Sequence, residues 1–79
     1  MEYVYLSMIS GYEETKVLGV YTELSKALEV AENTLKDEDF AYSSDFFAAY
    51  VVKAEVNGDV VSYFSRDKNN GEILQFCAT

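Results

Sequence analysis

Hydrophobic and polar residues alternate at the start of the chain and then change to a helical spacing. Residues 2–9 alternate with the period of two that is typical of a β-strand. One side of this strand carries Val4, Leu6 and Met8, and the other carries Tyr3, Tyr5 and Ser7. A polar turn over residues 11–14 and a β-branched run over residues 15–21 then predict an antiparallel hairpin.

A helix is predicted directly after this hairpin. Thr22 can cap the helix with its hydroxyl, and Glu23 suits the positive end of the helix dipole. The helical spacing is set by Leu24, Ala27, Leu28, Ala31 and Leu35. We therefore expect a helix over residues 23–36, with a charged outer face.

The second half of the chain reads as three further strands. They are expected over residues 46–56, 59–65 and 72–78, after a loop over residues 37–44. The dipeptide Asn57-Gly58 separates the first two, and it favours a two-residue type I′ turn in which both residues take positive φ. A cluster of turn residues over 67–71 precedes the last strand.

These elements predict an α+β fold of order ββαβββ, in which one helix packs on one face of an antiparallel sheet of four to five strands. We expect one domain over residues 1–79, because 79 residues allow a single modest core. One helix covers only one face of such a sheet. The opposite face, which we expect to carry Tyr3, Tyr5 and Tyr63, must then meet water or a partner.

The composition limits the chemistry that the protein can perform. The chain has no histidine and a single cysteine, Cys77, so it lacks the usual ligands of zinc and the usual base of a nucleophilic serine or cysteine. We expect no metal site, no cofactor and no catalytic residue, although paired carboxylates leave a carboxylate-based enzyme as a lesser alternative. A lone cysteine and a short N-terminal strand without basic flanks favour a cytoplasmic protein with no signal peptide and no membrane span.

Negative charge is concentrated around the helix and the loop after it. The net charge of the chain is −8, and residues 23–45 hold seven acids against two lysines. The candidate partner-binding acids are Glu29, Glu32, Asp37, Glu38 and Asp39. A field of this sign repels nucleic acid and attracts basic proteins. Two interpretations are open: a solvated surface, or a surface that docks on a basic or nucleic-acid-binding protein.

The first 35 residues carry a weak pattern of their own. It consists of Tyr3-Val4-Tyr5-Leu6, a Gly11-Tyr12-Glu13-Glu14 turn, and Val17-Leu18-Gly19-Val20-Tyr21-Thr22 leading into the helix. This pattern resembles small uncharacterised ββα-type proteins of bacteria and their phages. The resemblance implies no catalytic residues.

Together these features predict a small acidic binding protein that inhibits or sequesters a macromolecule by steric and electrostatic occlusion. A nucleic-acid-handling or defence protein is the expected kind of partner, by analogy in size and charge with acidic phage inhibitors. The alternative is a small-ligand or regulatory module that acts as a homodimer and buries its tyrosine face.

Overall fold

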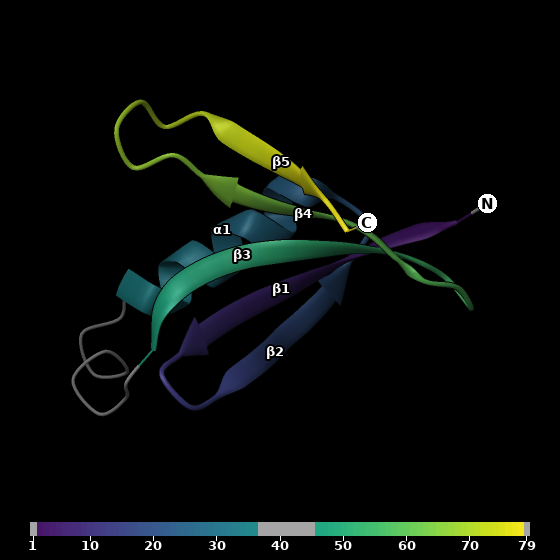
Figure 1. The fold of residues 1–79 in the computed structure, drawn as a ribbon, viewed down its shortest axis with the longest axis horizontal. Helices are drawn as coiled ribbons and strands as arrows, with labels where there is room; N and C mark the ends of the chain where they lie inside the picture. Colours follow the sequence, from purple (N-terminus) through teal and green to yellow (C-terminus); the bar gives the residue numbers. More distant parts are fainter. Residues whose placement is uncertain (1, 37–45, 79) are drawn as a thin grey trace.

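The computed structural model describes residues 2–36 and 46–78, which form one antiparallel sheet and one helix (Figure 1). The elements in chain order are β1 Tyr3–Gly11, β2 Thr15–Tyr21, α1 Leu24–Lys36, β3 Phe46–Glu55, β4 Val60–Arg66 and β5 Ile73–Cys77. The sheet has five strands in the spatial order β2-β1-β3-β4-β5. The predicted α+β fold of order ββαβββ is therefore confirmed.

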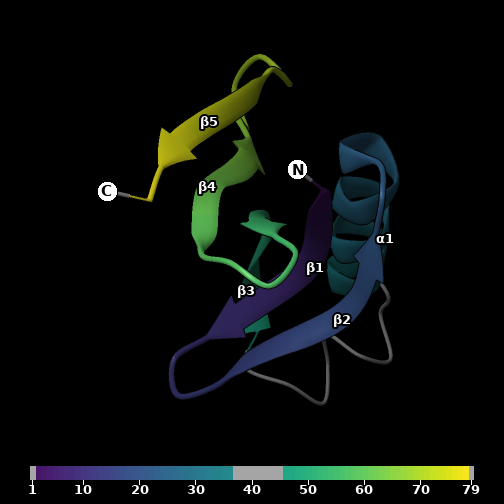
Figure 2. The same cartoon turned by 90° about the vertical axis from the view of Figure 1, so that its right-hand side faces the viewer.

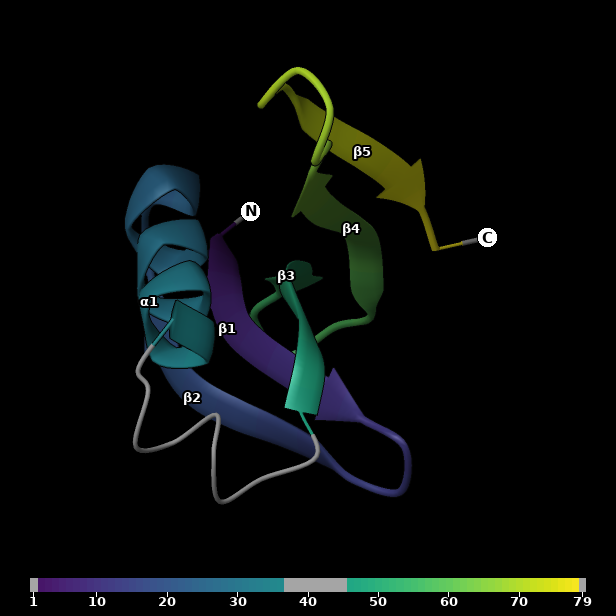
Figure 3. The same ribbon diagram turned by 90° about the vertical axis from the view of Figure 1, so that its left-hand side faces the viewer.

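Helix α1 packs on one face of the sheet, against β1, β2 and β3 (Figures 2 and 3). It begins at Leu24, one residue later than predicted, and the carbonyl of Glu23 accepts its first hydrogen bond, from the amide of Ala27 at 3.2 Å. Strands β4 and β5 extend beyond the helix, so β5 forms a sheet edge far from α1. None of the helices within residues 2–36 and 46–78 has the length and apolar character needed to cross a membrane.

Small residues allow the helix to approach the sheet closely. Ser7 on β1 is fully buried and its hydroxyl donates a 2.6 Å hydrogen bond to the carbonyl of Ala27. The helix presents Ala27 and Ala31, both fully buried, while the ring of Tyr21 occupies the space beside Gly19 on β2. Because the side chains of Ser7 and the two alanines are small, the backbone of α1 can lie against β1 within reach of a serine hydroxyl.

The core between helix and sheet is built from Ala27, Leu28, Val51 and Phe64, with Tyr5, Tyr21 and Leu24 packed around it. The rings of Tyr5 and Phe64 lie 6.2 Å apart at a tilt of 59°. The ammonium of Lys53 lies 4.5 Å from the ring centroid of Tyr3 and 6.0 Å from that of Tyr5. Aromatic and cation–π contacts of this kind add to area burial.

The prediction that Tyr3 and Tyr5 lie on the face away from the helix is therefore wrong. The two tyrosines share the helix side of β1 with buried Ser7, since alternate residues of a strand point the same way. The row of Val4, Leu6 and Met8 was expected to form the core, but the core beneath the helix is built from the other row, with Tyr5, Ser7 and fully buried Ile9. Tyr63 alone among the three predicted tyrosines lies on the opposite face, in register with Val52.

The β3–β4 hairpin forms as predicted, but its turn differs. Four residues, 56–59, separate the two strands, and the amide of Glu55 donates to the carbonyl of Asp59. Asn57 has a φ of 61°, whereas Gly58 is not among the residues with positive φ. A type I′ turn requires positive φ at both central residues, so that prediction is wrong. Asn57, not Gly58, takes the left-handed conformation.

Candidate binding surface

The face of the sheet that points away from α1, here called the outer face, is apolar across its whole width. Cross-strand register places one residue from every strand in a single row. In spatial order the row is Val20, Leu6, Val52, Tyr63 and Phe76. Residues directly opposite one another on one face are in side-chain contact range. The row is therefore a continuous apolar band across five strands.

Other outer-face positions continue this character above and below the row. They are Val4, Met8, Ser10, Thr15, Val17, Ala48, Tyr50, Ala54, Val60, Ser65 and Leu74. None of these positions is charged, in a chain in which a quarter of the residues carry charge. The four charged strand residues, Lys16, Lys53, Glu55 and Arg66, all alternate onto the helix side. Charge is thus segregated from the outer face.

The ends of the row are the most open part of the outer face. Val20 is 59% exposed and Phe76 is 51% exposed, while Tyr63 is 38% exposed. Val52 at the centre is buried by its neighbours, with 8% exposure. Among the described residues no helix lies over this face (Figures 2 and 3). A contiguous apolar surface of this kind marks an interaction site more often than chance.

The acidic residues predicted to bind a partner fall into three structural situations. Glu29 is exposed on the outward side of α1. Glu32 is half-buried, and its Oε2 accepts a 2.8 Å hydrogen bond from Nε of Arg66 on β4. Asp37, Glu38 and Asp39 lie outside the described residues. Of the predicted acids that the structure describes, Glu29 lies on the exposed side of α1 and Glu32 is paired with Arg66, so neither joins Tyr63 on the outer face.

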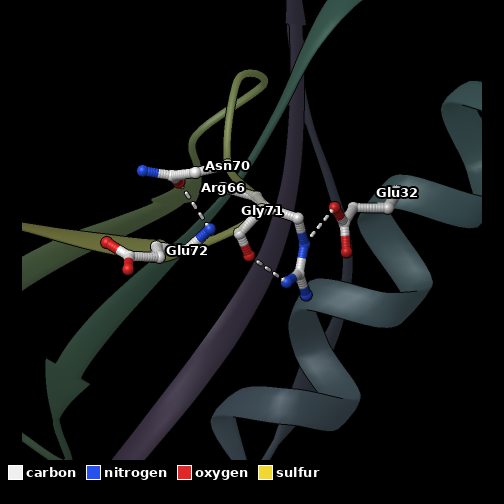
Figure 4. A network of polar contacts seen from close by, with 5 residues as sticks. All are labelled: Glu32, Arg66, Asn70, Gly71 and Glu72. Atoms are coloured by element: carbon white, nitrogen blue, oxygen red, sulfur yellow. Dashed lines mark hydrogen bonds and ion pairs between the residues drawn. The ribbon is translucent and has the colours of Figure 1, made fainter.

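Arg66 joins the helix to the β4–β5 turn (Figure 4). In addition to its bond to Glu32, it donates through Nη1 to the carbonyl of Gly71 at 2.8 Å. The turn is ordered internally by a 2.9 Å bond from the amide of Glu72 to Oδ1 of Asn70. Gly71 has a φ of 76°, which an L-residue adopts only with strain. The contacts hold the guanidinium between helix and turn.

A groove of about 740 Å³ opens beside this arginine, between the end of α1, the start of β3 and the β4–β5 turn. Leu35, Phe47 and Ala49 supply apolar lining. The charged lining consists of the cations Lys36, Arg66 and Lys68 and the carboxylates Glu32 and Asp67. Half of the six basic residues of the chain therefore line one groove of an acidic protein. Its volume is within the range of small-ligand sites, which runs from about 300 to 1,000 Å³.

The sequence predicted an uncovered sheet face opposite the helix, but it missed which strand residues form that face, and it missed the groove. One signal for the face was present: in the run over residues 46–56, both alternating sets are apolar at least as far as Val52, and Val51 and Val52 are both buried. A strand that is apolar on both sides indicates a sheet with two apolar faces. The groove is formed by residues far apart in the sequence, so no local pattern predicts it.

Within the part of the chain that the structure describes, no three acidic or cysteine side chains gather to hold a metal ion. Comparison of the chain with family models, with curated proteins and with solved structures finds no match. The function must therefore be argued from the surfaces themselves.

Proposed function

We infer that this protein binds another protein and occludes it, with the outer face of its sheet as the contact surface. The single observation that carries this proposal is the uncharged apolar band over all five strands. Exposure of an apolar sheet face to water is unfavourable, and burial against a partner with a complementary apolar patch lowers the free energy. Tyr63 and Phe76 are of the aromatic kind that is enriched in interfaces.

The acidic charge supports a partner with basic residues around its apolar patch. The chain has a net charge of −8 and the outer-face positions are uncharged, so the charges of the described residues can steer a basic protein from a distance without being buried in the contact. Nucleic-acid-handling and defence proteins are basic in this way. The single cysteine of the chain supports a cytoplasmic setting for this activity.

A charge placed on the outer face tests the proposal. Val20→Glu and Phe76→Glu each put a carboxylate at an open end of the band, where burial against a partner would desolvate it. Ser25→Glu is the matched control, because it adds the same charge at an exposed position on α1. Crosslinked complexes from the cells that produce the protein are compared by quantitative mass spectrometry.

Proteins captured by the wild type and by Ser25→Glu should be lost with Val20→Glu and with Phe76→Glu. If the same proteins remain bound to both outer-face variants, the outer face is not the contact surface. The role of the acids is tested separately by changing Asp37, Glu38 and Asp39 together to Asn, Gln and Asn. The association rate should then fall at low salt and differ less at high salt, because salt screens steering over about 8–10 Å.

A small-ligand module is the second candidate function, and the groove beside Arg66 favours it. Its lining suits an amphipathic anion, such as an aromatic carboxylate, with the ring on Leu35 and Phe47 and the charge near Lys36 or Lys68. Titration with naphthoate, followed by amide NMR shifts, should perturb the groove in the wild type. Lys68→Gln should weaken the effect, whereas Lys26→Gln, on the exposed side of α1, should not.

A further inference from the structure

We propose that two copies of this chain pair through the free edge of β5 and form one antiparallel sheet of ten strands. This inference concerns the edge of the sheet, not its outer face, and holds whether or not the outer face binds another protein. It begins with the direction in which the backbone groups of β5 point.

The hydrogen bonds between β4 and β5 show which backbone groups of β5 remain at the free edge. The amide of Asp67 donates to the carbonyl of Glu72 at 2.8 Å, and the amide of Ala78 donates to the carbonyl of Val61 at 3.2 Å. The register of the two strands is constant between these bonds. Because antiparallel partners alternate between bonded and non-bonded pairs, the even-numbered residues of β5 face β4. The amides and carbonyls of Ile73, Gln75 and Cys77 therefore point away from the sheet.

This edge is complementary to itself. In a two-fold pairing centred on Gln75, each Gln75 faces the other, and each Ile73 faces the partner's Cys77. All of these residues present outward backbone groups, so every pair can exchange two hydrogen bonds. On the outer face Leu74 then lies opposite the partner's Phe76, which is a favourable apolar pair. The outward backbone groups of Ile73, Gln75 and Cys77 are thus all paired with those of the second copy's β5.

The two edges of the sheet differ in how they resist such pairing. β2 carries Lys16 and a register shift between the partners of Ser7 and Met8, and both features discourage an added strand. β5 has the sequence Ile-Leu-Gln-Phe-Cys, with no charge and no proline, and all five of its residues are exposed. An apolar edge strand without these protections is a template for pairing. A second copy carries the same edge in the same register, so it is a partner whose bonding groups match those of this strand.

The contact is small, which sets the expected strength. Five residues a side bury less surface than the roughly 1,200 Å² of a standard interface, so we expect a weak dimer with a dissociation constant on the order of 100 μM. Each copy also carries a net charge of −8, so repulsion should weaken the dimer at low salt. A two-fold axis perpendicular to the sheet places both helices on the same side and joins the two outer faces into one surface.

A disulfide across the axis tests both the pairing and its register. In Gln75→Cys combined with Cys77→Ser, the two new thiols face each other, with Cα atoms about 5.5 Å apart as in a bonded pair. This distance allows a disulfide. In Leu74→Cys combined with Cys77→Ser, the thiols are diagonal neighbours at about 7–8 Å, too far to bridge. Mild oxidation should crosslink the first variant and leave the second as a monomer.

Proline at the same position blocks the edge without breaking the hairpin. The amide of Gln75 faces away from β4, so Gln75→Pro removes an edge donor and no bond of the ladder. Sedimentation at about 500 μM, well above the expected dissociation constant for a small interface, should show dimer for wild type and Gln75→Ala and monomer for Gln75→Pro. Added salt should raise the dimer fraction of the wild type. Two results would overturn the proposal: a wild type that stays monomeric at this concentration, or equal crosslinking of both cysteine variants. A monomeric wild type would mean that only a strand of another protein could pair with this edge.

Discussion

The two faces of the sheet differ in their charge and in what covers them. The helix side carries the charged strand residues, and beneath α1 it buries Ser7, Ile9 and Val51 completely. The outer face holds Leu6, Val52 and Phe76 and has no helix over it in the described residues. The helix therefore covers the face that holds the large apolar side chains of Ile9, Val51 and Phe64, and small Ser7 lies where the backbone of α1 comes closest. The uncharged apolar face is the one that α1 leaves open.

The largest expected difference between the two faces comes from one leucine on each. Leu28 on α1 is fully buried, so Leu28→Ala should lower the free energy of unfolding by about 3 kcal/mol through lost burial and a residual cavity. Leu74 on the outer face of β5 is 37% exposed, and Leu74→Ala should cost about 1 kcal/mol or less. Urea denaturation of both variants measures the contrast. Equal losses would mean that the outer face is packed in the isolated protein.

A second test concerns the turn that sets the register of β3 on β4. Asn57 has positive φ, so Asn57→Val should cost about 1–2 kcal/mol, because a branched side chain is strained there. Asn57→Gly should leave the stability nearly unchanged. A shift of one residue in the pairing register would move the inner side chains of a strand to the outer face, so the turn helps to fix which residues lie on each face. Thermal unfolding gives the comparison, and an unperturbed Asn57→Val would exclude the positive φ.

The smallest effect is expected from two buried serines on the helix side. Ser7 donates to the carbonyl of Ala27, so Ser7→Ala should cost about 1 kcal/mol. Ser62 is also buried, but its hydroxyl has no hydrogen-bond partner in the structure, so Ser62→Ala should be neutral or stabilising. Chemical denaturation of the two variants measures the contribution of the hydrogen bond between Ser7 on β1 and Ala27 on α1. A larger loss for Ser62→Ala would contradict this assignment.

Local patterns were enough to place every element of the fold. Alternation over residues 2–9 became β1, the spacing of Leu24, Ala27 and Leu28 became α1, and the Asn57-Gly58 signal marked the β3–β4 hairpin. These predictions succeeded because period and turn chemistry act over a few residues. The finer turn geometry was not predictable in this way: Asn57 has the predicted positive φ, but Gly58 does not, in a loop that lengthened to four residues.

The candidate surfaces depended on contacts that are distant in sequence. Tyr5 was expected on the open face, yet it packs on Phe64, which lies 59 residues further along the chain. The outer row needs all five strands in register, and the groove needs Lys36 beside Lys68. Alternation divides a strand into two sides, but it does not say which side the helix will cover.

The sequence by itself determined the elements, their order, the acidic charge and the absence of histidine chemistry, because each of these follows from residue types and short-range spacing. Only the tertiary structure decided which face of the sheet was buried and which backbone groups of β5 stayed free. The reason is that a helix and a sheet pack by matching shapes. The hydroxyl of Ser7 reaches the carbonyl of Ala27, which lies 20 residues further along the chain, and no single-strand pattern reveals such a contact.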